Sequence, residues 1–424
     1  MKKAVLFILL TVMLLGVFSC AQPAAGQILQ SDKPRDTSPD VSQTDQATLV
    51  DGNTAFAFNL YQVLRQTDGN LFYSPYSISE ALAMTYAGAN GDTAKQMADT
   101  LQFLLAQNQL HPAFNNLDLL LKQRGQGAQG KDDEGFRLNV VNAIWGQKDF
   151  KFLNSYLDVL AENYGAGLRL LDFENKPEDS RVTINKWVSE QTENRINDLI
   201  PQGAIDTLTR LVLTNAIYFN AAWQNPFDDK VTSSGTFYML NGSTTTAQMM
   251  HQSHSLGYAE GDNYQAVELP YSGGELSMVI LLPASGSFTE FQDSLDAAKV
   301  NDIISNLQRT QVVLTMPKFE FESSFGLNDA LRAMGMTDAF DPMKADFSGM
   351  DGKKDLCISD VIHKAFVSVD EAGTEAAAAT AVIITATAIL EKATMTIDRP
   401  FIFFVRDIQT GAILFIGQVM TMGK

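Results

Sequence analysis

The segment Gly373-Thr374-Glu375-Ala376-Ala377-Ala378-Ala379-Thr380 continues as Ala-Val-Ile-Ile-Thr-Ala-Thr-Ala-Ile-Leu to position 390, and its two halves favour different structures. The alanine run favours a helix, and taken alone it is typical of a buried one. The β-branched residues that follow fit a strand better. A segment that holds one conformation and later enters a β-sheet needs this mixture of small side chains, a glycine hinge and little charge.

In an extended form, this segment would divide its side chains between two faces. The first face would contain only uncharged residues, namely Thr374, Ala376, Ala378, Thr380, Val382 and Ile384. The second face would contain the one charged residue, Glu375, with Ala377, Ala379, Ala381, Ile383 and Thr385. Because the charge is confined to a face that could stay in water, the segment has the composition of a strand that can be inserted from solution.

The rest of the chain divides into a helical first part and a strand-rich second part. Apolar residues recur at helical spacing in 54–65 (Phe56, Leu60, Val63, Leu64) and in 93–105 (Met97, Leu101, Leu104). The pair Asn241-Gly242 predicts a hairpin turn. Short β-branched or aromatic runs bounded by turn residues predict strands at 138–145, 211–219, 266–269, 278–282, 311–316, 362–369, 401–406 and 413–419. Helices followed by bunched strands predict an α+β fold.

The N-terminus has the layout of a secretory signal. Lys2 and Lys3 precede the apolar run 4–15, and small residues lead to Cys20. The apolar run is too short for a membrane span. Because Val17-Phe18-Ser19-Cys20 resembles a bacterial lipobox, we expect a lipoprotein signal over 1–19 and a lipid on Cys20. Ordinary signal cleavage after Ala21 or Ala25, which would remove Cys20, is the alternative.

Composition then predicts two regions after the signal. Residues 20–50 are rich in Gln, Ser, Asp, Thr and Pro and contain few large apolar side chains, so we expect a flexible tether there. No second low-complexity break follows, and residues 51–424 are predicted to form one domain. The chain has 424 residues, 45% of them hydrophobic, which is ample for the core of such a domain.

Charge and cysteine content limit the partners of the protein. The formal net charge is −18, and cleavage before Cys20 would remove two lysines and no acidic residue, which gives −20. We therefore expect no binding to nucleic acid and no polyanion cofactor. If Cys20 is lipidated, Cys357 has no partner left, and we expect an exported protein without disulfides.

The sequence contains no recognisable catalytic motif. P-loop, G-x-G-x-x-G, G-x-S-x-G and H-E-x-x-H patterns are all missing from it. His251 and His254 are three positions apart, but no Cys or acidic residue stands near them at ligand spacing, so we expect no metal site. Ser359 and His363 are close in sequence without an orienting acid, and we assign no catalytic residue.

Four stretches, one of which overlaps the segment at Gly373, carry a family resemblance. They are Asn70-Leu71-Phe72-Tyr73-Ser74-Pro75-Tyr76-Ser77-Ile78-Ser79; Leu213-Thr214-Asn215-Ala216-Ile217-Tyr218-Phe219 with Ala222-Trp223-Gln224-Asn225-Pro226-Phe227; Asp370-Glu371-Ala372-Gly373-Thr374-Glu375-Ala376-Ala377-Ala378; and Asp398-Arg399-Pro400-Phe401. In this order, over roughly residues 53 to 420, they resemble the N-x-x-x-S-P-x-S-I segment, the central strand with its W-x-x-P-F turn, the reactive-loop hinge and the return from that loop in the serpin family. The resemblance implies the serpin fold, in which a helical N-terminal part packs on large mixed and antiparallel sheets and a reactive loop is exposed.

The resemblance also implies roles for individual residues. Ser74, Ser77, Asn215 and His363 would form a shutter cluster beneath the main sheet, although they could also be ordinary buried polar groups with satisfied hydrogen bonds. Trp223, Lys318 and Glu371 would form the breach, where the loop first enters the sheet, with Glu371 paired to Lys318. The hinge would comprise Glu371, Gly373, Thr374, Glu375, Ala376, Ala377, Ala378, Ala379 and Thr380.

The implied function is inhibition of serine-type endopeptidases by a suicide-substrate mechanism. The protease would cleave the loop and form an acyl-enzyme, and the loop would then insert into the main sheet. A hinge without bulky, charged or proline residues favours this function over the alternative, a non-inhibitory binding or chaperone protein. Counting from Gly373 places the scissile residue at Thr387, counting back from Pro400 places it at Ile389, and Ala388 lies between them.

The residues near the scissile bond restrict the target. Lys392 is the first basic residue after the hinge, so a trypsin-like pocket would find no partner for its buried Asp. We expect elastase-like or subtilisin-like targets, with papain-like cysteine proteases as a lesser possibility. The expected protein is a monomer that needs no cofactor, forms a covalent complex with its target, and is anchored through Cys20 to a membrane at the cell surface or in the extracytoplasmic space of a bacterium.

Overall fold

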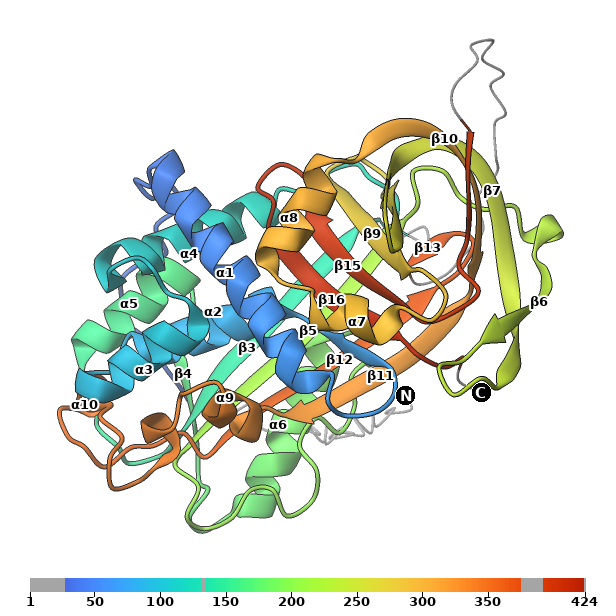
Figure 1. The fold of residues 1–424 in the computed structure, drawn as a ribbon. Helices are drawn as coiled ribbons and strands as arrows, with labels where there is room; N and C mark the ends of the chain where they lie inside the picture. Colours follow the sequence, from blue (N-terminus) through green and yellow to red (C-terminus); the bar gives the residue numbers. More distant parts are fainter. Residues whose placement is uncertain (1–26, 131–134, 375–391, 423–424) are drawn as a thin grey trace, which may run out of the picture.

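In the computed structural model, which describes residues 27–130, 135–374 and 392–422, two β-sheets form the frame of the molecule (Figure 1). The seven-stranded sheet has the order β1 (Gln27–Leu29), β4 (Leu168–Leu171), β3 (Arg137–Gln147), β5 (Leu211–Ala222), β13 (Gly373–Thr374), β12 (Asp360–Val369) and β11 (Phe319–Gly326). The nine-stranded sheet has the order β14 (Lys392–Thr396), β10 (Gln308–Pro317), β7 (Thr244–Gly261), β8 (Tyr264–Pro270), β9 (Leu276–Pro283), β15 (Phe401–Asp407), β16 (Ile413–Val419) and β2 (Leu71–Tyr73), with β6 (Ser233–Tyr238) beside β7.

The helices come mainly from the first half of the chain. They are α1 (Gln43–Leu64), α2 (Pro75–Tyr86), α3 (Gly91–Leu101), α4 (Gln107–Leu121), α5 (Asn154–Tyr164), α6 (Pro177–Gln191), α7 (Phe288–Asp293), α8 (Ala297–Ser305), α9 (Asn328–Ala333) and α10 (Ser348–Asp351). Helices α3, α4 and α5 gather at the left of Figure 1, and the nine-stranded sheet occupies the right. This arrangement confirms the predicted α+β class. Residues 375–391, which would contain the exposed reactive loop, lie outside the described part of the chain.

Strand β5 is buried along its whole length because both faces of the sheet are covered. Its odd-numbered side chains, such as Leu213 and Ile217, belong to the large core that includes α1 and α2. Its even-numbered side chains, such as Val212 and Ala216, pack in a second core with Ile184 and Val188 of α6. A strand enclosed in this way reads as a continuous apolar run, which is why the sequence predicted it correctly.

Helix α2 begins where the sequence places its Ser-Pro pair. Ser74 is the N-cap, its hydroxyl oxygen accepts a hydrogen bond of 3.1 Å from the backbone N–H of Ser77, and Pro75 takes the first helical position. Every residue of α2 is buried, because the helix lies against β3, β5 and β16. The Ser-Pro-x-Ser stretch is therefore fixed by local capping chemistry.

Two sequence expectations are wrong. The flexible tether predicted over 20–50 does not hold for residues 27–50, since β1 pairs with β4 at the sheet edge and α1 begins at Gln43. Composition missed this order because the segment is held by residues distant in sequence. The helix predicted at 93–105 ends at Leu101, since Gln102 adopts a left-handed conformation, and Leu104 points outward with 67% of its surface exposed.

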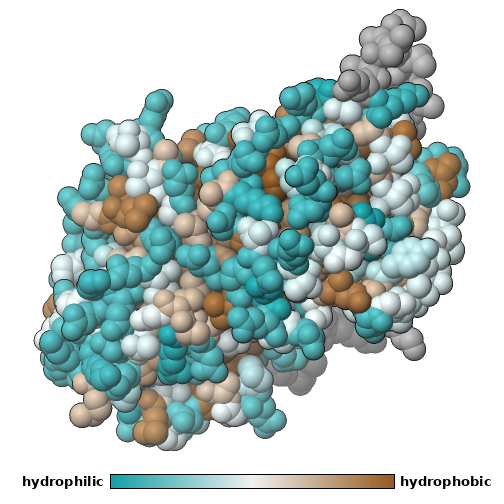
Figure 2. Space-filling model, viewed as in Figure 1, coloured by the Kyte–Doolittle hydropathy of each residue, from teal (hydrophilic) through white to brown (hydrophobic). Residues whose placement is uncertain are grey.

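The surface of the molecule is largely hydrophilic on the side drawn in Figure 2. Figure 2 shows hydrophilic residues over most of one face, with hydrophobic residues scattered among them in small groups. Within the described ranges, no helix combines the length and hydrophobicity that a membrane crossing would require.

A buried ion pair joins the end of α4 to the nine-stranded sheet. Arg124 Nε lies 2.7 Å from Asp407 Oδ1 and Nη2 lies 3.3 Å from Oδ2. The two side chains are 6% and 0% exposed. The same carboxylate also accepts hydrogen bonds from the backbone N–H and the hydroxyl of Thr410, at 2.8 and 2.6 Å.

The Arg124→Leu variant should lose about 3–5 kcal/mol of stability, because Asp407 would remain buried without its cation. The measurement is the midpoint of urea unfolding. Lys95→Leu, which removes an exposed ion pair with Asp99, is the control and should leave the midpoint nearly unchanged. Equal midpoints for the two variants would contradict this assignment.

Candidate functional site

The centre of the seven-stranded sheet has a gap at one end that β13 begins to fill. Strands β5 and β12 pair in parallel from Val212 opposite Asp360 to Ile217 opposite Ala365. Beyond this contact, β13 lies between them, with Gly373 opposite Ala222 and Thr374 opposite both Ala221 and Val369. A Cβ at position 373 would lie 2.2 Å from the Ala221 carbonyl oxygen, so glycine is needed for this close approach.

The residues around β13 hold it in place. Trp223 donates its backbone N–H to Ala372 O at 2.8 Å and its indole Nε1–H to Asp370 O at 3.0 Å. Thr374 is buried, and its hydroxyl lies 2.8 Å from the Tyr271 hydroxyl. The Tyr271 ring stacks on Trp223 with centroids 4.7 Å apart and planes 10° apart. The hinge residues Gly373 and Thr374 are thus already part of the sheet.

The predicted breach residues come together at this point. Glu371 Oε2 lies 2.6 Å from Lys318 Nζ, and Oε1 accepts a hydrogen bond of 2.7 Å from the Thr232 hydroxyl. Although burial alone would raise it, these hydrogen bonds hold the pKa of Glu371 below its ordinary value. The Glu371 side chain is 14% exposed, so this ion pair is partly shielded from water, unlike a typical surface pair.

The four predicted shutter residues also lie together, beneath the β5–β12 contact. His363 on β12 lies directly opposite Asn215 on β5. His363 Nδ1 is hydrogen bonded to Asn215 Oδ1, and His363 Nε2 accepts the backbone N–H of Ser74 at 3.2 Å. Asn215 Nδ2 donates to the hydroxyl oxygen of Ser77. Whether these bonds control sheet opening remains a prediction, since their geometry shows only that the groups are assembled.

Burial determines the protonation of His363. The side chain is completely buried, and burial lowers its pKa from 6.5 to about 3. A neutral ring fits the contacts, because Nε2 accepts a hydrogen bond and Nδ1 can then donate to Asn215. The imidazole therefore acts as a fixed hydrogen-bonding link between β12, β5 and α2.

Sequence reasoning missed two members of this cluster. Asn142 on β3 lies opposite Asn215, accepts its Nδ2–H, and also accepts the Ser77 hydroxyl at 3.1 Å. Asn142 Nδ2 donates to Glu80 Oε2 on α2 at 2.8 Å. Three neighbouring strands thus each contribute one polar side chain to the shutter cluster. Only the register of β3 against β5 reveals this, and the sequence contains no signal for it. Tyr271 and Thr232 were missed for the same reason.

Three of the serine and histidine residues considered from the sequence for catalysis or metal binding make structural hydrogen bonds. Ser359 accepts a backbone N–H from Arg210 at 3.2 Å, while the His363 ring is occupied by Asn215 and Ser74. His251 Nδ1 lies 2.9 Å from the Thr315 hydroxyl. In the part of the chain that the structure describes, no three His, Cys, Asp or Glu side chains are grouped to bind a metal ion.

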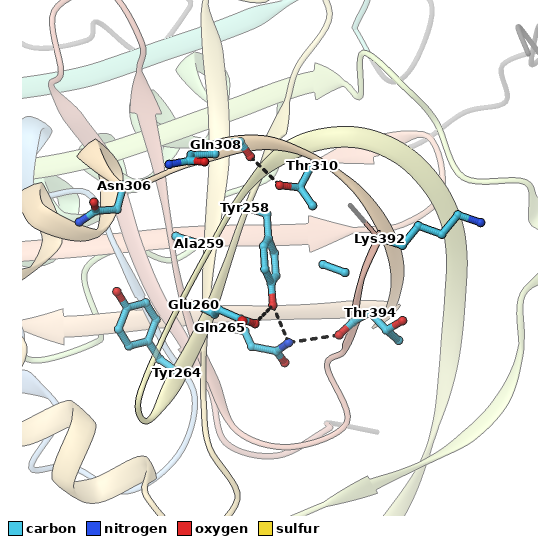
Figure 3. Close-up of a pocket in the computed structure, with 11 residues that line it drawn as sticks. Tyr258, Ala259, Glu260, Tyr264, Gln265, Asn306, Gln308, Thr310, Lys392 and Thr394 are labelled. Carbon is cyan, nitrogen blue, oxygen red and sulfur yellow. Dashed lines mark hydrogen bonds between the residues drawn. The ribbon is translucent and has the colours of Figure 1, made fainter. Parts of the chain in front are cut away.

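A polar hollow of about 850 Å³ lies where the chain re-enters the nine-stranded sheet at β14 (Figure 3). Tyr258 donates its hydroxyl to Glu260 at 2.7 Å, and Gln265 Nε2 donates to the Tyr258 hydroxyl at 2.8 Å and to Thr394 O at 3.1 Å. These bonds tie β14, the first strand after residues 375–391, to β7 and β8.

The remaining predicted residues lie outside the described part of the chain. They are the hinge positions Glu375, Ala376, Ala377, Ala378, Ala379 and Thr380, the scissile candidates Thr387, Ala388 and Ile389, and the lipidation site Cys20.

Comparisons with known proteins agree with this geometry. The family described as "Serpin (serine protease inhibitor)" matches residues 51–422. An uncharacterized serpin-like protein of Thermococcus kodakarensis is 38% identical over 99% of both chains. The human leukocyte elastase inhibitor is 39% identical, with 87% of this chain and 98% of that protein covered. The native-state crystal structure of tengpin, a thermophilic serpin, superposes with a TM-score of 0.81 at 30% identity, over 93% of this chain and 98% of that one.

The buried neutral His363 predicts acid sensitivity. Because its folded pKa is below that of the unfolded chain, the stability it contributes is present above about pH 6.5 and is lost as the pH falls toward 3. In His363→Gln, the free energy of unfolding measured in urea should fall less steeply below pH 6.5 than in the wild type. The difference in slope should be up to about 1.4 kcal/mol per pH unit. Wild-type and variant curves that run parallel from about pH 7.5 to pH 4 would refute the assignment.

Proposed function

This chain belongs to the serpin family, and from this premise we propose that it inhibits serine proteases as a suicide substrate whose cleaved loop inserts between β5 and β12. The observation that carries the proposal is the position of β13, which already occupies the end of the gap between these two strands. Extension of β13 by further residues would require β5 and β12 to separate.

The register of β13 predicts which side chains of the loop would face the core after insertion, and this supports the proposal. Thr374 lies opposite Ala221, so a continued antiparallel pairing would put Ala376 opposite Phe219 and Ala378 opposite Ile217. Residues opposite each other in an antiparallel pair point to the same face. Phe219 and Ile217 belong to the large core beneath the sheet, so the small uncharged face of the loop would enter this core. Thr380 would arrive opposite Asn215 and bring a hydroxyl group to the shutter cluster.

The chemical steps follow from this arrangement. The protease serine would attack the carbonyl carbon of the scissile residue, break the peptide bond and release the new amine on the C-terminal fragment. The resulting ester would keep the protease attached while the N-terminal part of the loop inserts. Insertion would have to precede hydrolysis of the ester, so the uncleaved protein must be held by a kinetic barrier and not by lying at its free-energy minimum.

The target class rests on the sequence between the hinge and β14. Thr387, Ala388 and Ile389 are small or aliphatic, and Lys392 is the first basic residue beyond them. Pockets of elastase-like or subtilisin-like serine proteases accept such side chains, whereas a trypsin-like pocket would be left with an unpaired charge. The leukocyte elastase inhibitors among the relatives support the same choice.

The cellular location is also a proposal. A lipid on Cys20 would hold the protein at a membrane, and the order of residues 27–42 shortens the proposed tether. From Cys20 to Gln27 the chain can span at most about 25 Å. The serpin body would therefore sit close to the membrane surface.

Incubation with elastase and with subtilisin should give a covalent complex that survives heating in denaturing gel electrophoresis. Mass spectrometry should show that the released C-terminal fragment begins at residue 388, 389 or 390, which is one position after the scissile residue. Cleavage of the loop without any stable complex would reject inhibition and favour the non-inhibitory alternative.

Thr374→Arg should convert the inhibitor into a substrate, because the long charged side chain cannot occupy the buried site beside Tyr271. The gel should then show cleaved protein and about a tenfold or greater loss of complex. Thr374→Ser, which keeps the hydroxyl, is the control. Undiminished complex formation by Thr374→Arg, in a variant with wild-type circular dichroism, would rule out insertion.

Cys20→Ser should move the protein from the membrane fraction to the soluble fraction of bacterial cells, because a serine side chain is not acylated. The measurement is an immunoblot of the two fractions. Retention of the variant in the membrane fraction would argue against a lipid anchor.

A further inference from the structure

The polar hollow beside β14 takes no part in the contacts at β13 or in the shutter cluster. Its volume is about 850 Å³, and its walls are the end of β7, the starts of β8 and β10, and β14. Asn306, which follows α8, completes the wall. A concave site of this volume is large enough to hold a small organic ligand.

A fixed network of hydrogen bonds around Tyr258 forms one side of the hollow (Figure 3). Tyr258 is buried, donates its hydroxyl to Glu260 Oε2 at 2.7 Å and accepts Gln265 Nε2 at 2.8 Å. Burial raises the pKa of Tyr258 to about 12, so the hydroxyl stays protonated and keeps both bonds. Gln265 Nε2 also donates to Thr394 O at 3.1 Å. The network is therefore held in place by three strands without any ligand.

This network leaves hydrogen-bonding groups available to a ligand. Within residues 27–130, 135–374 and 392–422, Glu260 Oε1, Gln265 Oε1 and the Gln308 side-chain amide have no hydrogen-bond partner. The hydroxyl groups of Thr310 and Thr394 line the same hollow. Carboxylate, amide and hydroxyl groups can pair with the hydroxyl groups of a sugar, because each sugar hydroxyl both donates and accepts.

Tyr264 adds an aromatic surface to these polar groups. It lines the hollow, is partly exposed, and its ring lies against Phe291 of α7 with centroids 5.5 Å apart. A Cβ at Gly261 would lie 2.5 Å from Tyr264 Cε1, so glycine allows the ring to approach the backbone of β7 closely. A ring fixed in this way offers an apolar surface to the C–H groups of a pyranose.

The lining residues are unsuited to several other classes of ligand. Among the described residues, Ala259 and Ala393 are the only aliphatic side chains of the hollow, which is too few for a largely apolar ligand. Lys392 is its one cation and is exposed, while Glu260 would repel a polyanion. Glu260 is also the one carboxylate of this lining, whereas Ca²⁺ needs about six oxygen ligands.

An added peptide strand is also a poor occupant. Strand β14 lies at the edge of the nine-stranded sheet, and such an edge can accept another strand. However, the carbonyl oxygen of Thr394 already accepts a hydrogen bond from Gln265 across the hollow. A peptide pairing with β14 at this point would have to displace that bond.

We propose that the polar hollow binds a short, uncharged oligosaccharide. Glu260, Gln265 and Gln308 would pair with its hydroxyl groups, and Tyr264 would pack against a ring face. Because the hollow includes Thr394, the bound sugar would contact β14, the first described strand after residues 375–391. The proposal is independent of the proposed inhibition of proteases.

Isothermal titration calorimetry of the full-length protein tests the site with three probes that differ in linkage and N-acetylation, namely maltotriose, cellotriose and chitotriose. At least one should bind once per chain with a Kd of about 1 mM or lower. Its affinity should change less than about twofold between about 0.05 and 0.5 M NaCl, because the ligand carries no charge. Failure of all three to bind would overturn the proposal.

A pair of glutamine variants tests the position of the ligand. Gln308→Ala should weaken binding of that trisaccharide about threefold to tenfold, because it removes an amide that has no partner in the described part of the free protein. Gln248→Ala is the matched control, since it removes an exposed amide of β7 that is bonded to Ser234 and lies outside the hollow, and it should leave the affinity unchanged. Equal losses in the two variants would reject binding at this site.

Hydrogen–deuterium exchange tests which strand the ligand contacts. The bound trisaccharide should slow exchange of the amides of β14 about threefold or more and leave those of β11, in the other sheet, unchanged. Protection that leaves out β14 would place the sugar elsewhere and contradict the proposal. If a blocked penta-alanine peptide bound and protected β14 while no trisaccharide did so, the hollow would be assigned to strand addition instead.

Discussion

The seven-stranded sheet is held closed by a short parallel contact between β5 and β12, and the rest of the structure is arranged around it. The contact ends at Ile217 and Ala365, and β13 takes up the space beyond it. Backbone groups along strand edges form hydrogen bonds readily. The sheet can therefore gain a longer central strand, but only after the β5–β12 pairing is broken. Under the proposed mechanism, the protein would hold this rearrangement behind a kinetic barrier.

Under the proposed mechanism, the height of that barrier would depend on buried polar groups at the same place. Asn215 and His363 face each other across the contact, and Ser74, Ser77 and Asn142 complete their hydrogen bonds. Satisfied buried polar groups fix one arrangement, while separated ones lose hydrogen bonds without access to water. At the open end, Glu371 with Lys318 and Trp223 with Tyr271 hold the start of the hinge. The shutter cluster is thus held by mostly neutral hydrogen bonds, and the contacts around the start of the hinge include an ion pair.

The shutter cluster contains two titratable groups, and burial favours the neutral form of each. Burial keeps His363 neutral by lowering its pKa and keeps Glu80 neutral by raising its pKa. A charge on His363 at low pH would be introduced into a fully buried site, and a charge on Glu80 at higher pH would be compensated in part by Lys122, Arg35 and the amide of Asn142.

The sequence by itself determined the α+β class, the main strands, the serpin family and the residues that meet at β13 and at the shutter. These depend on local hydrophobic runs, on capping at Ser74 and on motifs whose order is visible in one dimension. Only the tertiary structure decided the order of residues 27–42, the exposure of Leu104 and the inclusion of Asn142, Glu80 and Tyr271. Arg35 is paired with Asp118, 83 positions away, and Asn142 with Asn215, 73 positions away. Composition and periodicity report on neighbours along the chain, whereas strand register and buried ion pairs are set by contacts that form only when the chain has folded.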